Sequence, residues 1–337
     1  MTKLDPIATF RTGCAGTLKV ICLSGAMDAF DPFEPYSRAY IFNETGPNKW
    51  LFNQHDFLIA ALCVWQNPAT LQARCFAALG EDGEVAFLSP EIQREEIADS
   101  GLRRANSAGY GYLAGLKQIG NRLYACGYAG QVYRRMAVNR WEHMDIGILQ
   151  SPGIDDGAYM VRAIDGSDEQ SIYIVGSEST KGHPGRADHW NGYEWRRLEL
   201  PKGTGRLTTI HIESAARVWM VGADGTLLLG NNVDGFYNFG PLRETKLIFS
   251  IALFNGLGYL GTDLGLYKFD PNSPGKGFSK VRTGLDPVLQ DANIVQAVDG
   301  VLWSMGSKDL ARFDGSTWVR FHHPDNPSIL PSGGIGS

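Results

Sequence analysis

A short apolar strand that ends in glycine recurs seven times along this chain of 337 residues. The clearest copy is Leu123–Trp141, LYACGYAGQVYRRMAVNRW, which reads as a strand, a tight Gly-x-x-Gly turn, a second strand, and a third strand that carries tryptophan. The strand-ending glycines are spaced 39 to 55 residues apart, at Gly25, Gly80, Gly127, Gly176, Gly222, Gly261 and Gly306. A repeat of this length with four short strands is the size of one propeller blade. We therefore predict an all-β fold, a seven-bladed β-propeller with four antiparallel strands per blade.

The residues around these glycines support the repeat. Four units carry an aromatic residue three positions before the glycine: Tyr124, Tyr173, Trp219 and Trp303. The neighbouring positions are mostly apolar, which predicts strands covered on both faces, as strands between adjacent blades must be. We therefore expect the indoles of Trp219 and Trp303 to be buried. Several units have a second glycine at the following turn, where a positive φ is needed, and Asp309 takes that position in the seventh unit.

The first strand of each unit can also be located. The candidates are Ile7–Thr12, Phe57–Trp65, Tyr112–Ile119, Met160–Ile164, Leu207–Ile212, Ile248–Phe254 and Ile294–Val298. We predict a single propeller domain over residues 1–330 and a flexible tail over residues 331–337. The second unit is the least clearly marked, because its last strand, near Glu91–Ile97, lacks the aromatic residue found in the others.

Two phrases in the fourth and seventh units carry a family resemblance. HWNGYEW (His189–Trp195) and FDGSTW (Phe313–Trp318), each after a strand that ends in Val-Gly or Met-Gly, resemble the repeats of bacterial propellers related to the sialidase-type family. The sialidase aspartate box, S-x-D-x-G-x-T-W, is not matched. The resemblance covers most of the chain and implies the propeller architecture rather than the sialidase chemistry.

Composition and charge limit the class of protein. The net charge of −5 argues against a general nucleic-acid binder, which would carry a basic stripe. The first ten residues lack an apolar run of signal-peptide length, and no segment approaches the roughly 18–20 apolar residues of a membrane span. Five cysteines without CxxC spacing are typical of a reduced protein. We therefore expect a cytoplasmic protein that binds neither nucleic acid nor membrane.

Long connections indicate where function lies. In a blade of four antiparallel strands, the second-to-third connection and the connection to the next blade emerge at the same end. Most of the long connections are of these two kinds: Ala26–Ser37, Asp99–Gly111, Ile146–Ala158, Ser177–Ala187 and Arg282–Ala292. Function is carried disproportionately by long loops on a rigid scaffold. We therefore place the functional surface at this end of the blades.

The connection Ala26–Ser37 is the main candidate for a partner-binding site. Its acidic and aromatic residues are interleaved: Asp28, Phe30, Asp31, Phe33, Glu34 and Tyr36. Aromatic anchors, with charges that steer a basic partner, are features of protein-binding surfaces. One alternative is that the aromatic residues fold onto their own blade. Another is a calcium site, although the spacing D-x-x-D-x-x-E does not match an EF-hand loop.

A second candidate lies in Ser177–Ala187, where His183 and Arg186 would add to the partner-binding surface. His183 and His189 are six residues apart and could also ligate a metal, but no third ligand stands at a known spacing. We therefore predict neither a metal nor a cofactor.

The sequence favours binding over catalysis. It contains no G-x-S-x-G nucleophile elbow and no P-loop. The best hypothesis is a non-enzymatic protein-binding propeller, specifically an immunity protein that binds and neutralises a cognate bacterial effector toxin. An acidic face would complement a basic toxin. Two alternatives stay open: an assembly scaffold, and a glycan-binding or glycoside-processing propeller that uses carboxylates such as Asp155 and Asp156.

Overall fold

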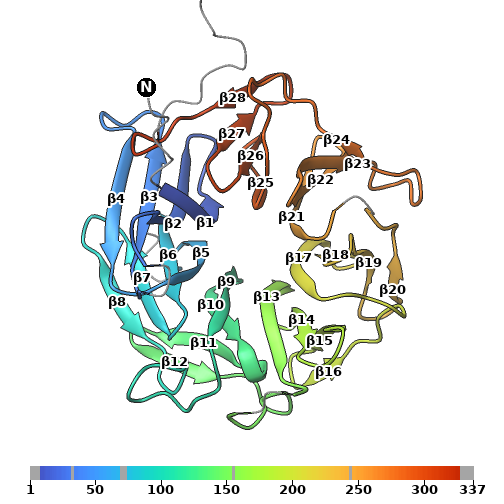
Figure 1. Ribbon diagram of the computed structural model, residues 1–337. Helices are drawn as coiled ribbons and strands as arrows, with labels where there is room; N and C mark the ends of the chain where they lie inside the picture. Colours follow the sequence, from blue (N-terminus) through green and yellow to red (C-terminus); the bar gives the residue numbers. More distant parts are fainter. Residues whose placement is uncertain (1–7, 32–33, 69–73, 154–155, 243–244, 327–337) are drawn as a thin grey trace, which may run out of the picture. The chain divides into compact units, whose positions relative to one another are not determined.

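The computed structural model describes residues 8–31, 34–68, 74–153, 156–242 and 245–326. Within these ranges the strands form seven antiparallel sheets, and each sheet is built from four strands that are consecutive in the sequence (Figure 1). The chain is a seven-bladed β-propeller with four strands per blade, as the glycine repeat predicts. The helical content of these ranges is the 3-10 turn η1 (Tyr128–Gly130). The predicted tail over residues 331–337 lies outside the described residues.

The blades fall into two compact units. Residues 1–56 together with 249–337 hold blades 1, 6 and 7, and residues 57–248 hold blades 2 to 5. The strands of the first unit are β1 (Ala8–Ala15), β2 (Val20–Met27), β3 (Ser37–Asn43) and β4 (Trp50–His55) in blade 1; β21 (Ile248–Phe254), β22 (Leu257–Thr262), β23 (Gly265–Phe269) and β24 (Ser279–Lys280) in blade 6; and β25 (Ile294–Val298), β26 (Val301–Met305), β27 (Leu310–Phe313) and β28 (Trp318–Arg320) in blade 7.

The strands of the second unit are β5 (Ile59–Trp65), β6 (Cys75–Gly80), β7 (Glu84–Leu88) and β8 (Gln93–Glu96) in blade 2; β9 (Leu113–Ile119), β10 (Arg122–Gly127), β11 (Val132–Ala137) and β12 (Arg140–His143) in blade 3; β13 (Tyr159–Asp168), β14 (Ser171–Glu178), β15 (Gly185–Trp190) and β16 (Trp195–Arg197) in blade 4; and β17 (Leu207–Ser214), β18 (Arg217–Gly222), β19 (Leu227–Asn231) and β20 (Gly235–Asn238) in blade 5. The first strands therefore start within two residues of their predicted positions. That the two units together form a single domain stays a prediction.

The hydrophobic core of each unit consists of layers between neighbouring blades. In the first unit, Phe10 and Phe42 of blade 1 share a layer with Trp303 of blade 7. In the second unit, separate layers join blades 2 and 3, blades 3 and 4, and blades 4 and 5. Trp219 and Trp303 are 0% and 1% exposed, so the predicted burial of both indoles is confirmed.

The strand-ending glycines recur for a reason of packing. At Gly176 an added Cβ would lie 2.0 Å from the carbonyl oxygen of Met160, and at Gly222 it would lie 2.1 Å from that of Arg206. Both oxygens belong to the backbone where the first strand of the same blade starts. The first two strands of the blade therefore leave no space for a side chain at this position.

The turn glycines behave as predicted, but Asp309 does not. Gly83 and Gly265 adopt φ angles of 97° and 105°, which disfavour other residues. Asp309 has no positive φ, so the prediction that it replaces a turn glycine is wrong. Its carboxylate instead lies 2.9 Å from Nε of Arg320 at the end of the same blade.

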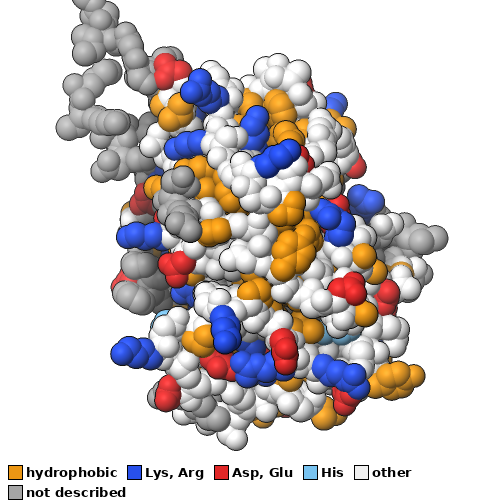
Figure 2. All heavy atoms as spheres, turned by 90° about the vertical axis from the view of Figure 1, so that its right-hand side faces the viewer, with side chains coloured by type: hydrophobic (Ala, Val, Ile, Leu, Met, Phe, Trp, Pro, Cys, Tyr) orange, Lys and Arg blue, Asp and Glu red, His pale blue; other side chains and the backbone are white. Residues whose placement is uncertain are grey.

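The surface carries mixed charge. On the side shown in Figure 2, basic and acidic side chains are interspersed among apolar ones. Neighbouring charges of opposite sign also pair, as in Arg217 with Glu213 at 2.8 Å and Arg196 with Glu194 at 2.6 Å. On this side the acidic side chains therefore do not form one continuous negatively charged patch.

A C-terminal strap, residues 321–326 after β28, holds blade 7 to blade 1 through aromatic contacts. The ring of Phe321 lies 4.7 Å from that of Phe42. His323 lies edge-on to Tyr40 and Trp50, with 4.5 Å between ring centroids in both cases. Because each blade is made of consecutive strands, no strand among the described residues is shared across this seam. Side-chain contacts hold it together with a backbone hydrogen bond from Phe10 to the Ser307 carbonyl at 2.8 Å.

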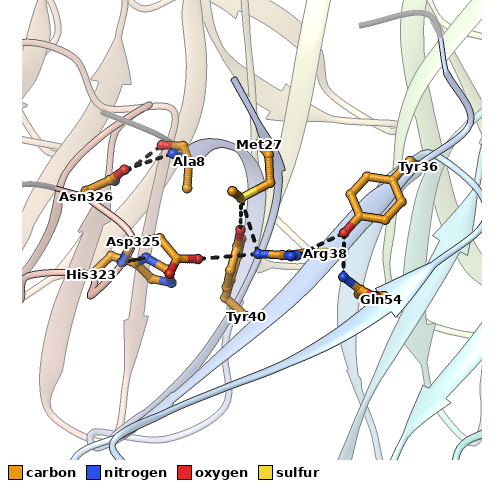
Figure 3. Close-up of polar contacts among 9 residues, drawn as sticks. All are labelled: Ala8, Met27, Tyr36, Arg38, Tyr40, Gln54, His323, Asp325 and Asn326. Carbon is orange, nitrogen blue, oxygen red and sulfur yellow. Dashed lines mark hydrogen bonds and ion pairs between the residues drawn. The ribbon is translucent and has the colours of Figure 1, made fainter. Parts of the chain in front are cut away.

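Polar contacts complete the strap (Figure 3). Asn326 accepts a hydrogen bond from the backbone N–H of Ala8 at 2.9 Å and donates one to the Ala8 carbonyl at 3.2 Å. Asp325 donates its backbone N–H to Nδ1 of His323 at 3.1 Å, and its carboxylate lies 3.4 Å from Arg38 of β3. The strap is thus fixed at its end and along its length.

The fourth strand of blade 2 forms although it lacks the aromatic residue that most other fourth strands carry. Glu95 of β8 is buried and accepts two hydrogen bonds from the Arg135 guanidinium of blade 3, at 2.8 and 2.6 Å. The indole N–H of Trp141 donates to the same carboxylate at 3.1 Å. An ion pair therefore holds this strand where most other blades use an aromatic ring.

Candidate partner-binding surface

The connection between β2 and β3 is shorter than the predicted Ala26–Ser37, because β2 continues to Met27. Backbone hydrogen bonds shape it: Phe30 donates to the Met27 carbonyl at 3.0 Å, Glu34 to the Asp31 carbonyl at 3.1 Å, and Tyr36 to the Glu34 carbonyl at 2.7 Å. Phe33 lies outside the described residues. The remaining predicted residues of this connection can be placed.

Phe30 and Tyr36 lie against each other, with 4.7 Å between their ring centroids. The Tyr36 hydroxyl accepts hydrogen bonds from Nε of Arg38 and from the side-chain amide of Gln54, both at 2.9 Å (Figure 3). These bonds anchor Tyr36 to β3 and β4 of its own blade. Phe30 remains 43% exposed. The connection therefore combines a ring that packs on its blade with a ring that a partner can reach.

The three acidic residues of the connection differ in their surroundings. Asp28 lies 2.6 Å from Nζ of Lys308, on the second-to-third connection of blade 7, and accepts a hydrogen bond from Thr9. Partial burial opposes ionisation of Asp28, but the hydrogen bonds from Lys308 and Thr9 hold its pKa below the ordinary value. Asp31 and Glu34 are exposed beside Phe30. Asp28 thus links two blades, whereas Asp31 and Glu34 face solvent.

Arg38 connects the aromatic residues of this region. Its guanidinium carbon lies 4.6 Å from the ring centroid of Phe52 on β4, and NH1 lies 3.2 Å from the sulfur of Met27. Asp325 of the strap balances its charge at 3.4 Å. Cation–π contact and hydrogen bonding therefore fix the Arg38 side chain between the connection and β4.

His183 and Arg186, in the second unit, are placed differently from each other. His183 is exposed on the connection between β14 and β15, with a φ of 43°. The predicted connection Ser177–Ala187 placed Arg186 in the loop. In the structure β15 begins at Gly185, so Arg186 lies on that strand. Its guanidinium lies 4.0 Å from the ring centroid of Tyr159 and its Nε donates to Asp188 at 2.9 Å. The role of both residues in partner binding stays a prediction.

An open groove of about 540 Å³ lies beside Arg186. Its lining includes Pro184, Leu198 and Leu200, together with Arg186 and Arg197. Both arginines are paired with carboxylates of this chain, Arg186 with Asp188 and Arg197 with Glu178 at 2.8 Å. The groove therefore combines apolar and polar lining, and the charges of both arginines are balanced within the chain.

Among the described residues, no group of three or more His, Cys, Asp or Glu side chains is arranged to hold a metal ion. No helix in the described part of the chain is both long and apolar enough to cross a membrane. The five cysteines are free thiols, and burial raises the pKa of Cys22 well above its ordinary value.

Sequence reasoning missed Arg38, Phe52 and Lys308. All three lie outside the predicted connection. Arg38 contacts it through Tyr36, Lys308 contacts it from blade 7 through Asp28, and Phe52 lies against Arg38. One signal could have pointed to Phe52: its strand, WLFNQH, has no Lys, Arg, Asp or Glu, unlike most of the other fourth strands.

No family model matches the chain. The chain is similar to the immune protein Tsi7 of Pseudomonas aeruginosa, with 31% identity over 243 residues, which cover 72% of this chain and 74% of that protein. Among solved structures, it resembles the WD40 β-propeller domain of Doa1, with a TM-score of 0.59, 11% identity, and coverage of 93% of this chain and 94% of that chain. It also resembles Sqt1 of Saccharomyces cerevisiae, with a TM-score of 0.55, 10% identity, and coverage of 95% and 86%.

A third resemblance is to PorZ of Porphyromonas gingivalis, with a TM-score of 0.56, 12% identity, and coverage of 96% of this chain and 39% of that chain. Identities of 10 to 12% relate these structures to the chain in fold alone.

Proposed function

The chain belongs to the family of the immune protein Tsi7, and from this premise we propose that it is an immunity protein that binds and neutralises a cognate bacterial effector toxin. The observation that carries the proposal is the 31% identity to that protein over 72% of this chain. The propeller fits this function, because a rigid scaffold can present long loops to a protein partner. The family assignment favours this function over the scaffold and glycan-processing alternatives.

The partner-binding surface is proposed to include the connection between β2 and β3. Phe30, Phe33 and Tyr36 act as aromatic anchors, because buried aromatic residues dominate interface energetics. Asp31 and Glu34 steer a basic effector and act mainly on the association rate. His183 and Arg186 form a second contact region. The supporting observation is the exposed ring of Phe30 beside these two acids.

The protein acts in the cytoplasm, without metal or cofactor and without contact with nucleic acid or membrane. The sialidase-type resemblance of its repeats remains a statement about architecture.

A co-expression experiment tests the function. The product of the neighbouring gene is expressed in bacteria with and without this chain, and growth is followed together with co-purification. The expected result is that the neighbouring product arrests growth, that this chain restores it, and that the two proteins purify together. Restored growth without complex formation would contradict neutralisation by binding.

Affinity measurements then test the anchors. Replacing Phe30 and Phe33 together by Ala should weaken binding by about a hundredfold, at about 1–2 kcal/mol per anchor. Calorimetric titration with the neighbouring product measures the change, after thermal denaturation confirms that the variant is folded. Unchanged affinity would remove this connection from the interface and turn attention to His183.

A further inference from the structure

The fourth strand of blade 1 is a sheet edge of unusual composition. β4, WLFNQH, is six residues long and has no Lys, Arg, Asp or Glu. The fourth strands of the other blades are two to four residues long, and all except β20 contain a charged residue. Proteins protect exposed sheet edges with short strands and charged side chains, because an unprotected edge pairs with other chains. β4 has neither protection.

The outward-facing backbone groups of β4 follow from its register. Asn43 donates its N–H to the Lys49 carbonyl at 2.7 Å, which makes these two residues a hydrogen-bonded pair between β3 and β4. Pairs an odd number of steps along an antiparallel ladder from such a pair are non-hydrogen-bonded. Phe52 and Gln54 occupy pairs of this second kind. Their N–H and C=O groups therefore point away from β3, toward the edge of the sheet.

Side chains beside this edge form a continuous surface, the edge patch, defined as Phe30, Tyr36, Arg38, Phe52 and Gln54. Phe52 is 53% exposed beneath the Arg38 guanidinium. The Tyr36 hydroxyl joins Arg38 to Gln54 (Figure 3). The Tyr36 ring lies 4.7 Å from the ring of Phe30. Aromatic residues and arginine are the types that dominate binding energy at protein interfaces. Their mutual bonds fix them before a partner arrives, which lowers the entropy lost on binding.

We propose that β4 and the edge patch form the docking edge for an extended segment of the cognate effector, which adds to blade 1 as a fifth strand. This inference rests on the proposed function. Strand addition takes affinity from backbone hydrogen bonds and specificity from the side chains beside them. The incoming segment places an apolar side chain on Phe52.

Charge identifies the occupant. Glu34 is exposed on the connection that carries Phe30, while Asp325 already balances Arg38 at 3.4 Å. The connection beside the edge patch therefore contributes negative charge and fits a segment that carries Lys or Arg beside its apolar residue. A second copy of this chain, with its net charge of −5, is a poorer complement.

The test uses the full chain and the product of the neighbouring gene in calorimetric titrations. Gln54→Pro removes an outward N–H from β4, and proline is tolerated on edge strands. Gln54→Ala is the matched control, because it loses the same side chain but keeps the N–H. Phe52→Ala tests the side-chain contact and leaves the backbone intact, so it decides the matter if Gln54→Pro does not fold.

We expect Gln54→Pro to bind about tenfold more weakly than Gln54→Ala, and Phe52→Ala to bind about tenfold more weakly than the unmodified chain. Full affinity in both Phe52→Ala and Gln54→Pro would overturn the docking edge while leaving the immunity function intact. Failure of the unmodified chain to bind would overturn both proposals. Sedimentation that shows a homodimer of the unmodified chain, dissociated by Gln54→Pro with effector binding unchanged, would assign the edge to a second copy and overturn the inference.

Discussion

The seam between blades 7 and 1 and the seam between blades 2 and 3 join neighbouring sheets by different chemistry. At the first seam, rings of the C-terminal strap pack against blade 1, with 4.7 Å between Phe321 and Phe42. At the second, the buried carboxylate of Glu95 is held by Arg135 at 2.6 and 2.8 Å. The first joins segments far apart in the sequence, and the second joins blades that follow each other along the chain. The seam between blades 7 and 1 is therefore sensitive to loss of apolar contact, and the seam between blades 2 and 3 is sensitive to loss of one charge.

The ion-pair seam should respond most strongly to removal of one partner. Glu95→Ala leaves the largely buried guanidinium of Arg135 without its carboxylate, and breaking a buried pair in this way costs about 3–5 kcal/mol. Urea denaturation measures the free energy of unfolding. The matched control is the double variant Glu95→Leu with Arg135→Met, which should recover much of the loss because no charge remains buried. Equal destabilisation by the single and double variants would contradict this account.

Loss of a large ring should damage the aromatic seam to a similar extent. Trp303→Ala removes an indole that is 1% exposed between blades 7 and 1, at an expected cost of about 3–5 kcal/mol. Trp219→Ala in blade 5 should cost about the same, since its indole is 0% exposed. Denaturation of each variant gives the value. A cost below about 1 kcal/mol at either site would show that the register of that strand is wrong.

Acid should weaken the aromatic seam in particular. Burial lowers the pKa of His323 from 6.5 to about 4, although Asp325 acts in the opposite direction. Between these two pH values the unfolded chain binds a proton that the folded chain excludes, so stability falls as the pH drops through this window. The loss reaches about 3 kcal/mol near pH 4 and is small above about pH 7.

His323→Phe keeps a ring in the strap but cannot take up a proton. Unfolding free energies of both proteins at several values between pH 7 and pH 4 should diverge, with the unmodified chain falling more steeply. Parallel curves would assign the acid sensitivity of the protein to other groups.

The smallest effect concerns the ion pair between Asp28 and Lys308, which supplements the same seam from a more exposed position. Asp28→Asn should lower stability by about 0.2–1 kcal/mol, and the difference should shrink as salt rises, because exposed pairs are screened. Thermal denaturation at low and high ionic strength measures it. Glu34→Gln serves as the control because Glu34 is exposed on the same connection. A loss that salt does not change would indicate a packing role for Asp28.

Features repeated along the sequence predicted the fold well. The glycine spacing indicated seven blades because backbone crowding excludes a side chain at several of these positions: at Gly25, Gly127, Gly176 and Gly222 an added Cβ would lie 2.0 to 2.7 Å from a carbonyl oxygen at the start of the first strand. Burial of Trp219 and Trp303 followed from apolar neighbours on both sides. Asp309 was misjudged because its role is set by a charge on another strand, Arg320, and not by its own backbone.

The candidate surface was predicted only in part. Composition drew attention to the connection after β2, but the residues that orient it come from elsewhere in the fold. Arg38 meets Asp325 across 287 positions of the sequence, and Asp28 meets Lys308 across 280. Such pairings leave no local pattern, because they depend on how the last blade and the strap pack against the first. Arg186 lies outside the observed connection because β15 begins at Gly185, although the predicted connection extends to Ala187.

The strap also has a consequence for synthesis of the chain on the ribosome. Trp50 donates its indole N–H to the His322 carbonyl across 272 residues, so the two sides of this contact emerge far apart in time. At about 5–20 residues per second, the delay is about 15–55 s. During this delay the rings of Phe42 and Trp50 are not yet covered by the strap. The nascent first blade therefore exposes apolar surface that chaperones can recognise. The pace of translation through the intervening blades therefore sets how long the newborn chain is open to aggregation.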